Sequence, residues 1–236
     1  MSFVISVYVN EGIVIASDRR TTYNKSQDIE GKHIELLGVH TNDSTDKTFM
    51  CPNGAGISTC GEASFKGRPI TGFIQDMIRT RIDAECDVRK IPQIIIDYFY
   101  ENEKVPDSQF MIAGYDKDPE KSEQLIFMLN LKTKKVDQID TANQGATWAG
   151  EGLTLMRLIQ NVGIIGENGK VDPLPYEDIS WNYFTLQDAV DFARYAVETT
   201  INTMHFKNTL ETVGGDIDIL IITKDETKWL QKKEIQ

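Results

Sequence analysis

A hydroxyl residue, Ser2, stands next to the start of the chain, and an acid-base cluster, Asp18, Arg19 and Arg20, follows sixteen residues later. Cells usually remove an initiator Met that precedes a residue as small as Ser, so we expect Ser2 to carry a free α-amine once Met1 is gone. Such an amine has an ordinary pKa of about 7.7–8.0, and it is a base attached to its own nucleophile. Many proteins begin with Met-Ser, so the rest of the chain must decide whether this pair is catalytic.

Composition limits the class of protein. The chain has 236 residues, of which 40% are hydrophobic, and its net charge is −11. Because no break reads as a linker, we expect one domain over residues 1–236. No stretch approaches the ~18–20 apolar residues of a membrane span, and no basic stripe suits nucleic acid. We therefore expect a cytoplasmic protein that binds neither membrane nor nucleic acid.

Cysteine and histidine usage indicates no disulfide framework and no metal site. The three cysteines are odd in number and scattered, and the three histidines form no ligand cluster with them. The glycines between residues 163 and 169 lack the Lys-Ser/Thr pair of a phosphate-binding loop. We expect no cofactor.

Strands and helices are predicted in pairs along the first half of the chain. Alternating and β-branched residues predict four strands, at 2–9, 13–16, 47–51 and 55–60. Apolar residues at helical spacing predict two helices, at 69–82 and 91–99. The polar stretch between residues 24 and 46 predicts an extended loop or a small hairpin.

The same rhythm returns in the second half. Strands are expected at 109–115, 124–131, 136–139, 217–223 and 227–230. A short helix is expected at 153–161, and Thr185 with Asp188 predicts a capping box at the start of a long one. The order implies an α+β fold: a four-layer α-β-β-α sandwich, with two stacked antiparallel sheets flanked by paired helices.

Four segments carry a resemblance to a known family. Gly12 to Thr22 resembles the opening of a proteasome β-type subunit, and Gly214 to Asp225 is similar to that family's glycine pair, Ile-Asp strand and final turn. Lys47-Thr48-Phe49 resembles the family's Lys-x-Phe segment, and Ile112 to Asp116 its Gly-x-Asp strand end. The likeness spans essentially the whole chain in order. It implies a proteasome-like N-terminal nucleophile (Ntn) hydrolase, the family that includes bacterial proteasome homologues.

The resemblance implies a catalytic group. The family's nucleophile falls on Ser2, its catalytic lysine on Lys47, and the acid that pairs with that lysine on Asp18. Arg20 is placed with this group, with a structural role as the alternative. A cation beside the Ser2 amine favours the neutral form that accepts a proton. The alternative for the Asp18 cluster is a solvated strand end with surface ion pairs.

The resemblance also implies a substrate site. It places an oxyanion donor at the backbone N–H of Gly61, where a missing side chain lets a carbonyl approach. A plain turn glycine is the alternative. Thr22 resembles in position the residue whose backbone pairs with an extended substrate, so a peptide would bind by strand addition.

Three positions depart from the family. Gly150 stands where a serine normally helps to hold the N-terminal amine. Leu210 and Val213 stand where an Asp and a Ser normally support the nucleophile, with Glu211 or Thr212 as substitutes from neighbouring positions. The stretch from residue 24 to 46 is also longer than the family pattern.

The sequence therefore predicts a serine hydrolase of the threonine-peptidase type that cleaves peptide bonds after Met1 is removed. The resemblance implies a homo-oligomeric ring or open ring, peptides or unfolded proteins as substrates, and an ATPase unfoldase as a further partner. Two alternatives stay open. One is a non-catalytic assembly subunit, which the three departures permit, and the other is a small-molecule amidase or acyltransferase.

Overall fold

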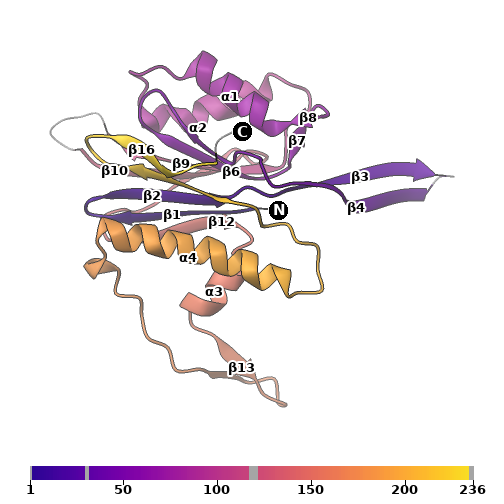
Figure 1. Ribbon diagram of the computed structural model, residues 1–236, viewed down its shortest axis with the longest axis vertical. Coiled ribbons are helices and arrows are strands. Elements are labelled where there is room, and N and C mark those ends of the chain that lie inside the picture. The colour runs from indigo at the N-terminus through magenta and orange to yellow at the C-terminus, as the bar shows by residue number, and fades with distance from the viewer. Residues whose placement is uncertain (1, 30–31, 117–121, 234–236) are drawn as a thin grey trace.

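The computed structural model describes residues 2–29, 32–116 and 122–233, and Figure 1 shows their arrangement. One five-stranded sheet has the order β12-β1-β2-β15-β16, and all its neighbours are antiparallel. Its strands are β1 (Phe3–Val9), β2 (Gly12–Asp18), β12 (Gly145–Gly150), β15 (Ile217–Ile222) and β16 (Thr227–Gln231). Three of them, β1, β2 and β15, are buried on both faces, which explains their nearly continuous apolar sequences.

The second five-stranded sheet has the order β11-β10-β9-β6-β5 and is also antiparallel. Its strands are β5 (Thr48–Met50), β6 (Gly56–Gly61), β9 (Ser108–Tyr115), β10 (Gln124–Asn130) and β11 (Lys135–Gln138). Side chains of both sheets, among them Ile13, Ile15, Met111 and Ile126, form one buried cluster. The two sheets therefore pack face to face.

Helices cover the outer faces (Figure 1). The second sheet packs against α1 (Ile70–Arg81) and α2 (Ile91–Tyr100) through the largest apolar cluster. The first sheet packs against α3 (Leu153–Ile159) and α4 (Leu186–His205). The described chain is thus a mixed α/β fold with antiparallel sheets, as the sequence predicts at that level. None of its helices has the length and apolar character needed to cross a membrane.

Two projections leave this body (Figure 1). The first is the hairpin of β3 (Thr21–Ile29) and β4 (Lys32–Asn42), which we call the arm. The second contains the short pair β13 (Gly163–Ile165) and β14 (Val171–Pro173). A further short pair, β7 (Ser64–Phe65) and β8 (Arg68–Pro69), precedes α1. The stretch from 24 to 46 therefore lies mostly in a long hairpin, where the sequence predicts an extended loop or a small hairpin.

Local signals explain most element boundaries. The capping box predicted at the start of α4 is confirmed, since Thr185 Oγ1 accepts from the Asp188 N–H and the Asp188 carboxylate accepts from the Thr185 N–H. Short 3-10 turns stand at Val88–Lys90 and Trp181–Tyr183. The aromatic cluster at the second turn packs on α4, because Trp181 and Phe184 both contact Phe192. Tyr183 is exposed instead.

Candidate active site

The centre of the site is the buried ion pair between Lys47 and Asp18. Lys47 Nζ lies 2.7 Å from Asp18 Oδ1 and donates a second hydrogen bond to the carbonyl of Arg20. The Asp18 carboxylate also accepts from the backbone N–H groups of Phe3 at 3.0 Å, Arg20 at 3.1 Å and Gly214 at 3.0 Å. Four donors therefore fix one fully buried carboxylate, which needs such compensation away from water.

Burial sets the electrostatics of Lys47. It lowers the pKa of the Lys47 ammonium below the ordinary value, and the negative charge of Asp18 opposes that shift. An ammonium has three N–H donors, and two of them are used by Asp18 and Arg20. Lys47 and Ser2 line the same narrow pocket, so the third donor is available to that space.

Alternation along β1 places Ser2. Phe3, Ile5 and Val7 belong to the cluster under α4, whereas Val4 and Tyr8 belong to the cluster between the sheets. Ser2 has the parity of the second group, so its side chain lies on the face toward β6. It is 7% exposed and lines two hollows. The predicted removal of Met1 concerns a residue outside the described part of the chain.

The two hollows differ in size. The one shared by Ser2 and Lys47 holds about 30 Å³, little more than space for water. The other, between Ser2 and α3, holds about 510 Å³ and is lined by Trp148, Leu153 and Met156. Cys60 and Gly61 line both hollows. Ser2 thus stands at the boundary between a small polar pocket and a larger apolar one.

Gly61 and Thr22 frame this boundary. Gly61 ends β6 with φ +120°, and a Cβ there would lie 2.4 Å from the carbonyl oxygen of Asp107. Thr22 lies in β3, which has β4 as its partner on one side among the described strands. Both residues line the pocket that contains Ser2. Strand addition uses a strand edge of this kind, and β3 offers one beside the pocket.

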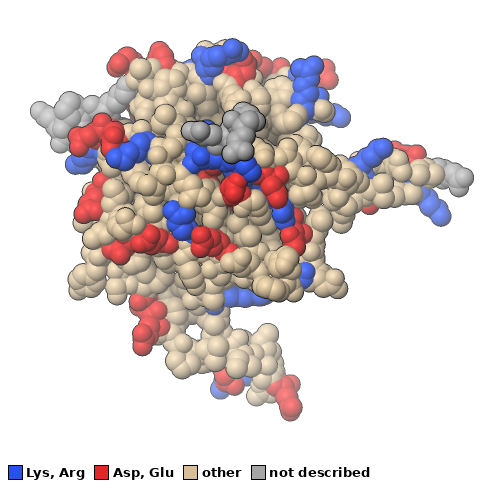
Figure 2. Space-filling model, in the orientation of Figure 1, with Lys and Arg blue, Asp and Glu red and all other residues tan. Residues whose placement is uncertain are grey.

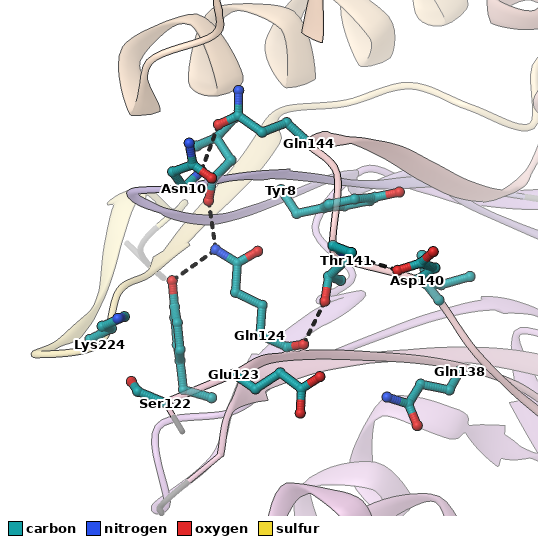
Figure 3. Close-up of a pocket in the computed structure, with 14 residues that line it drawn as sticks. Tyr8, Asn10, Ser122, Glu123, Gln124, Gln138, Asp140, Thr141, Gln144 and Lys224 are labelled. Atoms are coloured by element: carbon teal, nitrogen blue, oxygen red, sulfur yellow. Dashed lines mark hydrogen bonds between the residues drawn. The ribbon is translucent and has the colours of Figure 1, made fainter. Parts of the chain in front are cut away.

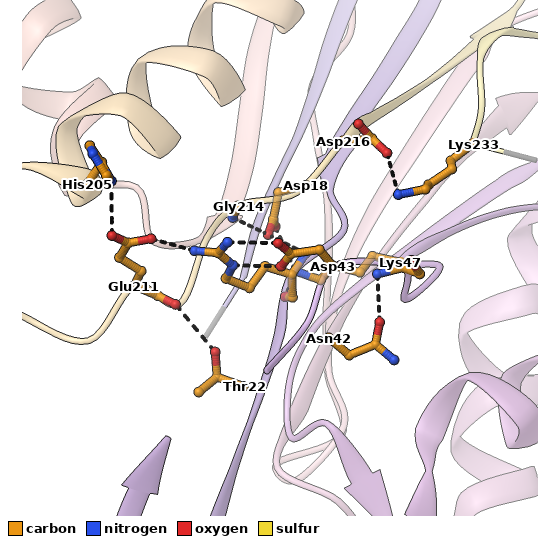
Figure 4. Close-up of polar contacts among 12 residues, drawn as sticks. Asp18, Thr22, Asn42, Asp43, Lys47, His205, Glu211, Gly214, Asp216 and Lys233 are labelled. Atoms are coloured by element: carbon orange, nitrogen blue, oxygen red, sulfur yellow. Dashed lines mark hydrogen bonds and ion pairs between the residues drawn. The ribbon is translucent and has the colours of Figure 1, made fainter. Parts of the chain in front are cut away.

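Arg20 is held by acidic side chains. Its guanidinium donates to both oxygens of Asp43 at 2.7 and 2.8 Å and to Glu211 at 2.5 Å (Figure 4). These bonds raise the pKa of Arg20 above its ordinary value. Asp43 follows the arm and Arg20 precedes it, so the pair closes the arm at its base. The Arg20 side chain therefore lies between Asp43 and Glu211, while the Arg20 backbone N–H donates to Asp18.

Neighbouring Arg19 is buried and has a similar anchoring role. Its guanidinium lies 2.6 Å from Asp218 and 2.7 Å from Asp46. Burial raises the pKa of the Asp218 carboxyl, and the charge of Arg19 opposes that shift. The cluster Asp18-Arg19-Arg20 is therefore a set of directed ion pairs and not a solvated strand end.

The residues that depart from the family have other contacts. Val213 is buried in the cluster under α4, and Leu210 lies 41% exposed. Glu211 bonds Arg20 and His205, and the Thr212 hydroxyl faces the sulfur of Met204 at 3.9 Å. None of these contacts involves Ser2 within the described part of the chain. Support for Ser2 comes instead from the backbone.

Gly150 supplies that backbone support. Its φ is +86°, and a Cβ built on it would lie 1.8 Å from the carbonyl oxygen of Ser2. The same oxygen accepts from the N–H of Glu151 at 2.9 Å, and β12 pairs Gly150 with Phe3. A serine at residue 150 cannot coexist with this close approach, which explains the departure from the family pattern.

Gly150→Ala is therefore expected to lower the free energy of unfolding by about 2–4 kcal/mol, because it adds left-handed strain and a backbone overlap. Urea denaturation measures this loss. Gly72→Ala is the matched control, since Gly72 lies in α1 with open space around it, and it should raise stability by about 0.5–1 kcal/mol. Equal effects of the two substitutions would contradict the role of Gly150.

Cys60 is the other nucleophilic side chain at the boundary. Burial raises the pKa of its thiol to about 11. A thiol with that pKa is overwhelmingly protonated at neutral pH, and the thiolate is the reactive form. Cys60 is therefore a buried thiol and not a reactive thiolate at neutral pH.

Three residues have roles at the site that the sequence does not predict. Gly214 belongs to the glycine pair of the family resemblance, but its N–H donates to Asp18, and a Cβ there would lie 2.6 Å from the Arg20 guanidinium carbon. Glu211, which the sequence offers as a support for Ser2, binds Arg20 instead. Asp43 and Glu211 clamp Arg20 (Figure 4). These contacts join segments that are distant in sequence, so the sequence does not indicate them. For Asp43, the position of an acidic residue beside a long insertion is a usable signal.

A separate polar hollow of about 290 Å³ lies at the opposite end of β1 (Figure 3). Its side chains bond one another and the backbone: Gln124 Nε2 donates to the Val9 carbonyl at 2.6 Å and to the Tyr115 hydroxyl at 3.0 Å. Gln144 accepts from the Asn10 N–H at 2.6 Å. These bonds tie the β1–β2 turn to the second sheet. The hollow does not contain Ser2, Asp18 or Lys47.

Similar proteins are found by comparison of structures and not by comparison of sequences. No protein-family model matches the chain, and no curated protein matches its sequence. A solved structure of an Anbu (Gly-1) mutant from Hyphomicrobium sp. strain MC1 has a TM-score of 0.62 and 13% identity, over 100% of this chain and 87% of that one. Anbu from Yersinia bercovieri, described as an ancestral beta-subunit, has a TM-score of 0.58 and 11% identity, over 98% and 87%. The chain therefore has a fold like that of these Anbu proteins.

Proposed function

We propose that this protein is a proteasome-like N-terminal serine hydrolase that cleaves peptide bonds. One observation carries the proposal: Ser2 lines a pocket with Lys47, whose ammonium is paired with the buried Asp18 carboxylate. The proposal takes the body as one domain over residues 1–236 and as the four-layer α-β-β-α sandwich of the Ntn hydrolases. It also takes the protein as cytoplasmic.

The chemistry begins once cleavage of the Met1–Ser2 bond frees the Ser2 amine. The Ser2 hydroxyl oxygen attacks the substrate carbonyl carbon, and the amine takes the hydroxyl proton directly or through a water. The Gly61 N–H stabilises the negative charge that forms on the carbonyl oxygen. The tetrahedral intermediate then expels the leaving amine, which receives the proton from the Ser2 ammonium. Water cleaves the resulting ester by the same steps and restores Ser2.

Lys47 supports this chemistry as a fixed cation. A positive charge near the Ser2 amine disfavours its protonation, so more of the amine is neutral at a given pH. Asp18 holds Lys47 in place, and the Asp18 contact with the Phe3 N–H aligns the start of β1. Arg20 acts through its backbone, because its carbonyl accepts from Lys47 and its N–H donates to Asp18.

The substrate is an extended peptide that lies between Thr22 and Gly61. The larger hollow beside α3 suits an apolar side chain, since Trp148, Leu153 and Met156 line it. Such a site fits an unfolded protein segment better than a compact small molecule. By analogy with the fold, the copies assemble into a ring or open ring, with an ATPase unfoldase as the source of unfolded chains.

A non-catalytic assembly subunit is the second candidate function. Its supporting observation is that Gly150, Leu210 and Val213 supply no polar side chain beside Ser2. Intact-mass analysis of protein purified from cells separates the two functions. The hydrolase requires that Met1 be absent from the assembled material. Quantitative retention of Met1 would leave Ser2 without a free amine and would favour the non-catalytic subunit.

The pH dependence of kcat/KM tests the role of Lys47. We expect activity to rise as the Ser2 amine loses its proton, near or below its ordinary pKa of about 7.7–8.0. We call this rise the acid limb of the pH profile. Lys47→Met removes the neighbouring cation, so the amine pKa should rise and the acid limb should shift to higher pH by about one unit. On the alkaline side, the lowered pKa of Lys47 means that its charge is lost below the pH of an ordinary lysine.

Two variants control this measurement. Lys47→Arg keeps the positive charge and should leave the acid limb in place even if the rate falls. Lys224→Met removes an exposed lysine beside the distant polar hollow and should change neither limb. An acid limb that stays fixed in Lys47→Met would show that Lys47 does not tune the amine.

A further inference from the structure

Between residues 25 and 36, the large apolar side chains of the described part of the arm lie on one face, and the other face is polar. Cross-strand pairing puts Lys25 with Leu36, Gln27 with Ile34 and Ile29 with Lys32 on one side. The other side carries the pairs Ser26–Glu35 and Asp28–His33. Ile29, Ile34 and Leu36 are 45%, 36% and 43% exposed. In Figure 1 this hairpin stands clear of the body, so no other described element covers its apolar face.

A second apolar surface lies on the other projection. It is formed by α3 and the β13–β14 segment, and we call it the α3–β14 surface. Its exposed large side chains are Leu153, Met156, Leu158, Val162, Ile164, Ile165, Val171, Leu174 and Tyr176. Figure 2 shows both projections as mostly uncharged, with charged groups concentrated near their ends. Exposed apolar areas of this extent mark interaction sites.

Neither projection is expected to be stable as an uncovered element. A two-stranded hairpin alone is marginally stable in water, and the arm is a two-stranded sheet without a third described strand. Its base is nevertheless fixed, because Arg20 binds Asp43 with two hydrogen bonds and Glu211 with a third. A rigid base with an exposed apolar face is a pre-organised binding element, which loses little entropy on docking.

We propose that the arm of one copy of this protein packs its apolar face on the α3–β14 surface of a second copy. The two surfaces lie on separate projections of one chain, so the contact joins two different surfaces. A dimer formed in this way keeps one free arm and one free α3–β14 surface. Repetition of this contact builds a ring or an open chain. The inference rests on the self-assembly in the proposed function and not on hydrolysis.

Charge complementarity favours this occupant. The apolar face of the arm carries two lysines, Lys25 and Lys32, while Asp28 and Glu35 lie on the opposite face. The segment from residue 153 to 178 carries Glu167, Asp172, Glu177 and Asp178 against Arg157 and Lys170. All six of these charged residues are exposed. A basic, apolar face therefore meets an acidic, apolar surface, which selects this pairing over arm against arm.

Light scattering after size-exclusion chromatography measures the mass of three variants beside the wild type. The arm variant carries Ile34→Asp and Leu36→Asp, and the surface variant carries Leu158→Asp and Ile165→Asp. We expect wild-type oligomers and monomers of both variants. Ser26→Asp adds one negative charge to the polar face of the arm, against two in the arm variant, and should leave the oligomer intact. Circular dichroism melts check that each variant keeps its fold.

Mixing the two monomeric variants gives the decisive result. Each keeps one intact surface, so the mixture should form a dimer and stop there. Failure of the mixture to dimerise would overturn the pairing of unlike surfaces. Oligomers that persist in either variant would overturn the proposed surfaces while leaving self-assembly in place. A wild type that stays monomeric at high concentration would overturn self-assembly itself, and hydrolysis would still be tested separately by activity.

Discussion

Ser2→Ala is expected to reduce kcat/KM for a peptide amide by about 1,000-fold or more. The substitution removes the only atom proposed to bond to the substrate carbon, and it leaves substrate binding and the Gly61 donor in place. Alanine is as small as serine, so removal of Met1 should be unaffected. Hydrolysis of peptide amides with a fluorescent leaving group measures the loss directly.

Ser6→Ala is the matched control for this prediction. Ser6 lies on β1, which Ser2 directly precedes, has the same parity as Ser2 and is fully buried. Its hydroxyl has no hydrogen-bond partner within the described residues. Because its removal breaks no contact, activity should stay within a factor of about two and stability should hardly change. Equal activity in the wild type and Ser2→Ala would eliminate Ser2 as the nucleophile.

Asp18→Ala is expected to lower the free energy of unfolding by about 3–5 kcal/mol. The carboxylate is the shared acceptor for Lys47 and for the N–H groups of Phe3, Arg20 and Gly214. Its removal leaves a buried ammonium without its carboxylate and takes the Asp18 acceptor from the N–H groups of Phe3 and Gly214, while the Arg20 N–H keeps the Gly214 carbonyl at 2.8 Å. These donors come from β1, the chain after β2 and the chain before β15, so the whole site should loosen.

Urea denaturation measures this change, and the same protein should lose hydrolytic activity. Asp191→Ala on the exposed face of α4 makes the same substitution where the carboxylate bonds only a surface glutamine in the described chain. It should change stability by about 0.5 kcal/mol or less. A loss for Asp18→Ala as small as that of the control would show that the carboxylate does not organise the site.

The fold was predictable where side-chain patterns are local. The β1–β2 hairpin and helices α1, α2 and α4 follow from alternation, helical spacing and the Thr185 cap, with boundaries displaced by a residue or two. Strand β12 was not predicted, because Gly145–Gly150 contains small residues and reads as a turn. Its pairing with β1 makes it a strand, and pairing between distant segments leaves little trace in either sequence.

The arm could not be predicted for a related reason. Its strands are exposed on both faces, so burial imposes little alternation on their sequence. The pairing shift between Tyr23 and Lys25 breaks the pattern further. The sequence showed only a polar insertion with a short apolar run. The paired backbone reveals that Ile34 and Leu36 of this run share one face with Lys25 and Lys32.

The site was predictable in part. The family resemblance led to Ser2, Asp18 and Lys47; in the structure Asp18 pairs with Lys47, and Ser2 lines a pocket with Lys47. The sequence could not show that Gly150 admits the Ser2 carbonyl, because the reason is a distance between two backbones. Nor could it show that Arg20 is held by Asp43 and Glu211, which lie at opposite ends of the chain.

The most direct test of the proposed nucleophile is the mass and position of a covalent adduct. A peptide epoxyketone adds to a hydroxyl and an adjacent α-amine of one residue, forming a ring that includes both, so it reports an N-terminal nucleophile specifically. Peptide mapping by mass spectrometry should find one probe per chain, on Ser2, with Met1 absent, and none in Ser2→Ala. An adduct on Cys60, or no adduct on protein that lacks Met1, would contradict the proposed mechanism.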